Sequence, residues 1–91
     1  MAIEIVSYRA FPKNTLRGFL TVRLTSVGLQ INEICLHEKN GKRWLSMPAR
    51  SYEKKDGGGT AWAIMVEFFD KSKMEVFQDQ TLAALDNYLK Q

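Results

Sequence analysis

The sequence has little cysteine, histidine or proline, and each scarcity excludes a class of protein. Its 91 residues include one cysteine, one histidine and two prolines. A lone cysteine cannot form a disulfide within the chain, which favours a reducing compartment. No stretch approaches the roughly 18–20 consecutive apolar residues that a membrane-spanning helix needs. The first residues carry a carboxylate, Glu4, where an export signal would carry positive charge, so we expect a cytoplasmic protein.

Groups that could perform catalysis or hold a metal are also sparse. Cys35 and His37 are two residues apart, and this spacing on a strand rarely gives the geometry of a nucleophile with its base. A structural zinc ion needs four nitrogen or sulfur ligands, and the sequence offers two good ones. The run at residues 57–60, Gly-Gly-Gly-Thr, lacks the Gly-Lys-Ser/Thr ending of a phosphate-binding loop. We therefore predict a non-enzymatic protein without cofactor or metal, in which Cys35 packs and His37 is solvated.

The composition that remains is that of a small folded domain. Hydrophobic residues make up 45% and charged residues 25% of the chain, which argues against disorder, and the length allows one domain over residues 1–91. Residues 1–60 hold ten Lys and Arg against five Asp and Glu, whereas residues 61–91 hold three against five. Positive charge thus lies in the first two thirds, where it could attract a polyanion in a salt-dependent way. A solvated, mixed-charge surface is the alternative explanation.

Alternation of apolar and polar residues predicts five strands. They cover residues 3–8, 16–24, 29–36, 43–47 and 61–69. In the third strand the apolar phase changes at Asn32 and Glu33, which predicts a β-bulge. The pair Asn40-Gly41 then gives the strongest short signal for a hairpin turn.

The remaining segments are read as two loops and a helix. Turn-forming residues predict loops over residues 11–14 and 52–60. Beyond residue 70 the apolar period becomes helical, with a stripe formed by Met74, Phe77, Thr81, Leu85 and Tyr88. Ser72 and Glu75 fit a capping box at the start of this helix. The sum predicts an α+β fold: an antiparallel sheet of four to five strands with one C-terminal helix packed on one face.

One helix covers only one face of a sheet, so the predicted sheet has a second, open face for water, a partner or a ligand. On the strand at residues 16–24 the two faces differ sharply in chemistry. Leu20, Val22 and Leu24 share one face, and Arg17, Phe19, Thr21 and Arg23 share the other. Further cations and rings on strands and loops complete the candidate set: Arg9, Lys42, Arg43, Trp44, Arg50, Tyr52, Lys54 and Lys55. Single-stranded nucleic acid is bound by this combination, because cations follow phosphates while rings stack on bases. Alternatively, Phe19 and Trp44 pack in the core or a subunit interface, and the cations serve solubility.

A resemblance adds to this interpretation. Residues 41–50, Gly-Lys-Arg-Trp-Leu-Ser-Met-Pro-Ala-Arg, resemble the SpoVG septation-regulator family of bacteria, which has a glycine turn, a short apolar strand and a Met-Pro-Ser/Ala-Lys/Arg ending there. The chain is also similar to small phage and bacterial proteins that have a Trp-Leu/Val-Ser-x-Pro-Ala-Arg run and a Phe-Gln helix, here Phe77-Gln78. The resemblance implies a small α+β domain that forms a homodimer through its sheet and binds nucleic acid in a regulatory role. Two departures are the missing His-Pro-Ile element at residues 61–64 and the acidic terminal helix, so the sheet and residues 50–55 are the better candidates for DNA contacts.

The residues and the resemblance together predict a non-catalytic, nucleic-acid-binding homodimer with single-stranded DNA as the favoured ligand. The predicted binding residues are Arg17, Phe19, Arg23, Arg43, Trp44, Arg50, Tyr52, Lys54 and Lys55. Two alternatives stay open. One is a regulatory protein-interaction module whose open face docks another polypeptide, because Trp, Tyr and Arg also dominate such interfaces. The other is an enzyme whose site is shared across a dimer axis, which needs Cys35, His37 or Glu67 to meet their symmetry mates.

Overall fold

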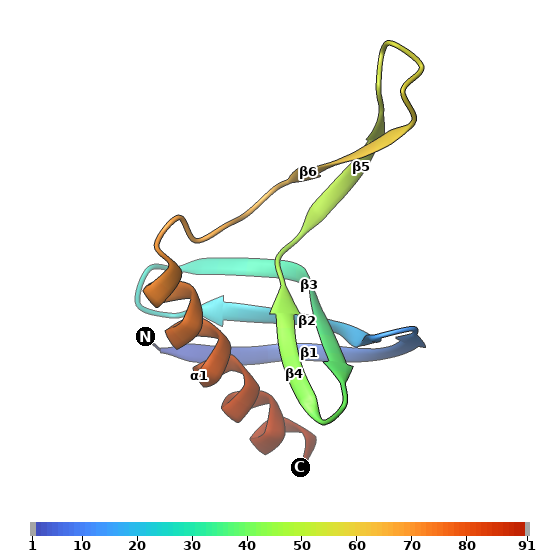
Figure 1. The fold of residues 1–91 in the computed structure, drawn as a ribbon. Helices are drawn as coiled ribbons and strands as arrows, with labels where there is room; N and C mark the ends of the chain where they lie inside the picture. The colour runs from blue at the N-terminus through green and yellow to red at the C-terminus, as the bar shows by residue number, and fades with distance from the viewer. Residues whose placement is uncertain (1, 91) are drawn as a thin grey trace.

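The computed structural model describes residues 2–90, which form six strands followed by one helix (Figure 1). The strands are β1 (Ile3–Lys13), β2 (Leu16–Leu24), β3 (Leu29–Lys39), β4 (Lys42–Ser46), β5 (Ala49–Glu53) and β6 (Thr60–Ile64), and the helix is α1 (Lys71–Leu89). Strands β1 to β4 form an antiparallel sheet in sequence order, and β5 and β6 form a separate antiparallel pair. The predicted α+β class, with a four-stranded antiparallel sheet and a C-terminal helix, is confirmed.

Two asparagines allow the tight turns of the main sheet. Asn40 and Gly41 have φ angles of 55° and 79°, as a two-residue hairpin between β3 and β4 requires. At the β1–β2 turn the corresponding residue is Asn14, at φ 56°. The loop predicted over residues 11–14 is therefore wrong for its first three residues, since β1 continues to Lys13. Pro12 is tolerated there because β1 is an outer strand of the sheet.

Extra residues bend two strands of this sheet. The bulge predicted in β3 is confirmed: Ile31 and Ile34 pair with Val22 and Leu20, so β3 has one residue more than β2 in that interval. Glu33 of the bulge has φ 59°. As a result, two isoleucines of opposite parity lie in the same core, 4% and 0% exposed. Strand β1 also has one more residue than β2 at two places, between residues 5 and 7 and between residues 10 and 13.

Helix α1 covers one face of the four-stranded sheet (Figure 1). The buried hydrophobic residues are Leu20, Val22, Leu24, Ile31, Ile34, Leu36, Leu45, Phe77 and Leu85. On the helix, Phe77, Thr81 and Leu85 are fully buried, which confirms the central part of the predicted stripe. The end of the stripe is exposed, since Tyr88 is 37% accessible.

The start of α1 differs from the prediction. Asp70, rather than Ser72, is the N-cap residue, so the predicted capping box is wrong. The Asp70 carboxylate accepts hydrogen bonds from the backbone N–H groups of Ser72 and Lys73, at 3.0 and 3.4 Å, and from the Ser72 hydroxyl at 2.7 Å. The bond from that hydroxyl is the largest cause that lowers the pKa of Asp70. Asp70 fits this role because its backbone is extended, at φ −105°, whereas Ser72 already lies within the first turn.

Strands β5 and β6 form a hairpin, residues 49–64, that projects away from the main sheet, and we call it the arm (Figure 1). The arm corrects two predictions, because β5 continues to Glu53 within the predicted loop and β6 ends at Ile64 within the predicted strand. None of residues 49–64 is buried. The chain beyond the arm returns to the body, where Val66 and Phe68 pack against the core.

Candidate nucleic-acid interface

The sheet face opposite α1 is the open face that the sequence predicts. Because strand residues alternate between faces, the neighbours of the core residues point away from the helix. One row of register partners crosses all four strands on this side: Arg9, Phe19, Cys35 and Ser46. No element of the described residues 2–90 forms a second layer over this row comparable to α1 (Figure 1).

Two aromatic groups lie on the open face. On β1 and β2, the rings of Phe11 and Phe19 are 5.8 Å apart, and the guanidinium carbon of Arg9 lies 5.0 Å from the centroid of Phe19. On β3 and β4, His37 and Trp44 stack with centroids 5.4 Å apart and an interplanar angle of 9°. Phe11 is 50% exposed, whereas Phe19 and Trp44 are half-buried. Sequence analysis missed Phe11 because it assigned that residue to a loop, although its strand spacing from Arg9 was a usable signal.

His37 is not the solvated group that its position suggested. It is half-buried, and its Nδ1 lies 3.0 Å from the Thr15 hydroxyl while its Nε2 lies 3.0 Å from the Ser46 hydroxyl. Both ring nitrogens are therefore engaged by hydroxyl groups on neighbouring strands. These two bonds fix the imidazole ring, and the stacked imidazole in turn fixes the orientation of Trp44.

The cations of the open face are partly paired with carboxylates. Arg23 lies 3.7 Å from Glu4, and Arg9 lies 3.4 Å from Glu33. All four side chains are more than half exposed, so both pairs are weak and open to competition from salt or a phosphate. Arg17 is the extra residue of β2 against β3, and its guanidinium donates to a backbone carbonyl at 3.0 Å.

Arg43 lies on the other side of the sheet from its neighbour Trp44. Its Nη1 and Nη2 donate to the two carboxylate oxygens of Asp86 on α1, at 2.7 and 3.0 Å. This hydrogen-bonded pair raises the pKa of Arg43 and lowers the pKa of Asp86. In contrast to its predicted place among the ligand-binding cations, Arg43 therefore lies in the contact between β4 and α1.

The other predicted binding residues lie on the arm. Arg50 and Tyr52 pair with Ala63 and Ala61 and share one face of the hairpin. Lys54 and Lys55 follow at its tip, where the chain turns. The predicted residues therefore form two groups, one on the open sheet face and one on the arm, with Arg43 separate from both.

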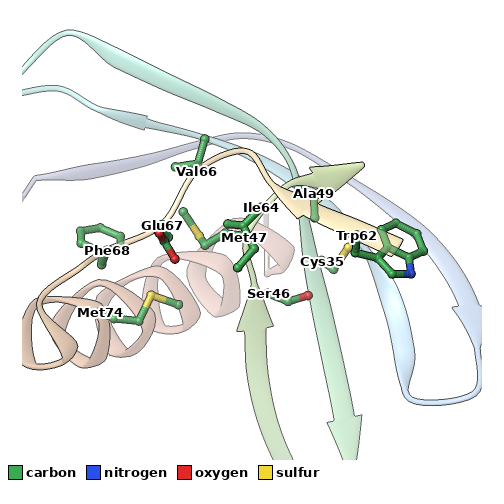
Figure 2. Close-up of a pocket in the computed structure, with 10 residues that line it drawn as sticks. All are labelled: Cys35, Ser46, Met47, Ala49, Trp62, Ile64, Val66, Glu67, Phe68 and Met74. Atoms are coloured by element: carbon green, nitrogen blue, oxygen red, sulfur yellow. The ribbon is translucent and has the colours of Figure 1, made fainter. Parts of the chain in front are cut away.

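An apolar groove, which we call the arm groove, lies where the arm leaves the body (Figure 2). It has a volume of about 490 Å³. Its lining residues are Cys35, Ser46, Met47, Ala49, Trp62, Ile64, Val66, Glu67, Phe68 and Met74. Sequence analysis did not predict this groove, although the alternation of Trp62 and Ile64 with two alanines was visible.

Comparison of the chain with protein-family models, curated proteins and solved structures finds no match. The resemblance to septation regulators therefore stays a prediction that depends mainly on residues 41–50. Within residues 2–90, no helix has the length and apolar character needed to cross a bilayer. The same residues contain no cluster of three His, Cys, Asp or Glu that could hold a metal ion.

Proposed function

We propose that this protein is a non-catalytic, cytoplasmic regulator that binds single-stranded nucleic acid, preferably DNA, on the open face of its sheet. The observation that supports the proposal is the grouping of Phe11, Phe19 and Trp44 with Arg9 on the side that α1 leaves uncovered. Bases stack on such rings without sequence preference, and neighbouring cations neutralise the phosphates.

Binding would begin at Phe11 and Phe19, where the more exposed ring lies beside a cation. A base that stacks on Phe19 would displace the Arg9 guanidinium from the ring toward a phosphate. Arg17 and Arg23 lie on the same strand on either side of Phe19. The phosphates would compete with Glu4 and Glu33 for their partners, so we expect moderate affinity and low sequence specificity.

The cations of the arm would extend this path. Arg50, Lys54 and Lys55 are exposed, and the ring of Tyr52 beside them is 48% accessible. They would hold the backbone of a longer oligonucleotide after it leaves the sheet. We therefore expect affinity to increase with oligonucleotide length until both groups are engaged.

The test is a fluorescence anisotropy titration with a labelled single-stranded oligonucleotide, repeated with duplex and at two salt concentrations. We expect log affinity to fall with log salt by roughly 0.7 per neutralised phosphate. The double variant Arg17→Glu with Arg23→Glu should abolish binding without unfolding the protein. Phe19→Ala should weaken binding about 5- to 150-fold, the loss of one stacked base.

A matched control is Lys71→Glu with Lys73→Glu, which makes the same change of charge in the first turn of α1. It should leave most of the affinity, because these lysines lie on the helix rather than on the open face. Wild-type affinity in the Arg17 and Arg23 variant would contradict the proposal. Binding that hardly depends on salt would instead favour the alternative, a protein-interaction module.

A further inference from the structure

The arm has little support within one chain. It is a two-stranded hairpin with no buried residue, joined to the body by its base, where the Met65 N–H donates to the Pro48 carbonyl at 2.9 Å. An isolated hairpin of two strands is marginally stable in water. Ordering its backbone costs about 1–2 kcal/mol per residue, and burial within the subunit does little to offset that cost. An arm with this sequence therefore needs a surface against which to pack.

Large apolar side chains collect on the arm and on the segment that follows it. Trp62 is 70% exposed and Ile64 is 63% exposed, and both belong to the arm face that lines the arm groove. The exposed apolar residues between positions 49 and 69 are Tyr52, Trp62, Ile64, Met65 and Phe69. At roughly 100 Å² of accessible surface each, they offer about 500 Å², which is as large as the main apolar patch of a typical monomer and often marks an interface.

The arm groove is suited to an apolar, extended segment. Its walls are mostly hydrocarbon and sulfur, from Met47, Val66 and Met74 on the body and from Trp62 and Ile64 on the arm (Figure 2). A phosphate backbone would lose its hydration there without gaining a cation, because the groove lining holds no Lys or Arg. The occupant must therefore be apolar and must bring unpaired backbone groups that the outer edges of β5 and β6 can satisfy.

We propose that the occupant is the arm of a second copy of this chain, so that two chains exchange arms in a two-fold homodimer. Each chain already carries both halves of such an interface, the apolar arm face and the groove, and a two-fold axis satisfies both at once. Two arms together bring about 1,000 Å² of apolar surface, before the groove walls are counted, which reaches the lower limit for a specific interface. In the dimer, Trp62 becomes buried against the partner. This inference goes beyond the proposed function and does not depend on nucleic-acid binding.

Oligomeric mass is the first test, measured by sedimentation equilibrium without nucleic acid. The wild-type chain should sediment as a dimer, and Trp62→Lys with Ile64→Lys should raise the dimer dissociation constant more than about tenfold. The control is Val27→Lys, which adds a lysine at a position that is 71% exposed but lies in the β2–β3 turn. Circular dichroism should show that both variants keep the fold, because neither position contributes to the core.

The second test follows Trp62 directly and does not require a destabilising change in the arm. The chain has two tryptophans, so Trp44→Phe leaves Trp62 as the sole indole. Its emission should shift to shorter wavelength, and its quenching by iodide should fall, as protein concentration rises through the dimer dissociation constant. The Arg17→Glu and Arg23→Glu variant should still dimerise, which separates this inference from the proposed function.

Three outcomes would overturn the inference. They are a wild-type chain that stays monomeric into the high micromolar range, a dimer that the Trp62 and Ile64 substitutions do not weaken, and a Trp62 emission that does not change with concentration. A monomer whose groove binds an unrelated polypeptide would also overturn it, and would favour a protein-interaction module.

Discussion

Single side chains determine how the outer strand β4 is held against the helix. Arg43 and Asp86 join the two elements through two charge-assisted hydrogen bonds. One helical turn pair earlier, the Gln78 side-chain oxygen accepts from the Leu45 backbone N–H at 3.0 Å. This bond satisfies a donor at the edge of the sheet that would otherwise face the helix unpaired. The sequence does contain the signal for Arg43, because the alternation that places Trp44 on the open face places its neighbour on the other.

Replacing Asp86 with Asn should destabilise the protein modestly and change its response to pH. The two side chains of the ion pair are 32% and 45% exposed, so we expect at most about 1 kcal/mol, or a melting temperature lower by about 4–8 °C. The pKa of Asp86 is lowered in the folded state, so its stabilising contribution is present above the unfolded value near 3.9 and is lost as pH falls through the lower, folded value.

Thermal unfolding measured between pH 2 and pH 7 checks this expectation. The difference between wild type and Asp86→Asn should be full at neutral pH and should shrink as the wild-type carboxylate becomes protonated. Asp79→Asn is the matched control, because Asp79 is exposed on the same helix. An equal loss of stability in both variants would show that the ion pair with Arg43 contributes nothing.

At the scale of elements, local patterns predicted what local physics determines. The bounds of β2, the Asn40-Gly41 turn, the bulge in β3 and the buried stripe of α1 all depend on near neighbours in the sequence. Strand pairing is different, because alternation marks a strand without naming its partner. For that reason the strand predicted at residues 61–69 was placed in the main sheet, whereas β6 pairs only with β5 in the arm.

Deleting Asn32 should test whether the bulge in β3 is needed for the core. Without the extra residue, the preceding part of β3 shifts by one position, which moves Ile31 out of the core and brings Gln30 toward it. We expect a loss of about 2–5 kcal/mol in the free energy of unfolding, as for removal of a buried isoleucine side chain. Urea unfolding gives the measurement. Deletion of Gly58 at the arm tip should have little effect, and an Asn32 deletion as mild as this one would count against a structural role for the bulge.

The whole molecule divides into a body, which holds the entire core, and an arm, which holds none of it. The candidate site follows this division. The open face with Phe19 and Trp44 was predictable, because one helix leaves one sheet face uncovered. The separation of Arg50, Tyr52, Lys54 and Lys55 from that face was not predictable, because it depends on where the chain leaves the sheet after β4.

Replacing the arm, residues 49–64, with Asn-Gly should leave a folded body. The ends of the arm are adjacent, since Ala49 pairs with Ile64 and Pro48 is hydrogen-bonded to Met65, so a two-residue turn can close the gap. At concentrations where the full chain is monomeric, we expect the melting temperatures of the two chains to agree within about 4 °C, less than 1 kcal/mol for a domain of this size. Calorimetry and the amide NMR spectrum provide the measurement, and loss of cooperative unfolding would show that the body depends on the arm.

The two added residues in β1 have a consequence for aggregation. Growth of a cross-β fibre begins on a straight row of free amide and carbonyl groups, and β1 is the longest outer strand of the sheet. The extra residues interrupt that row twice, and Pro12 removes one donor from it. An incoming strand therefore finds no uninterrupted template along this border, and concentrated solutions of the protein are protected from fibre growth there.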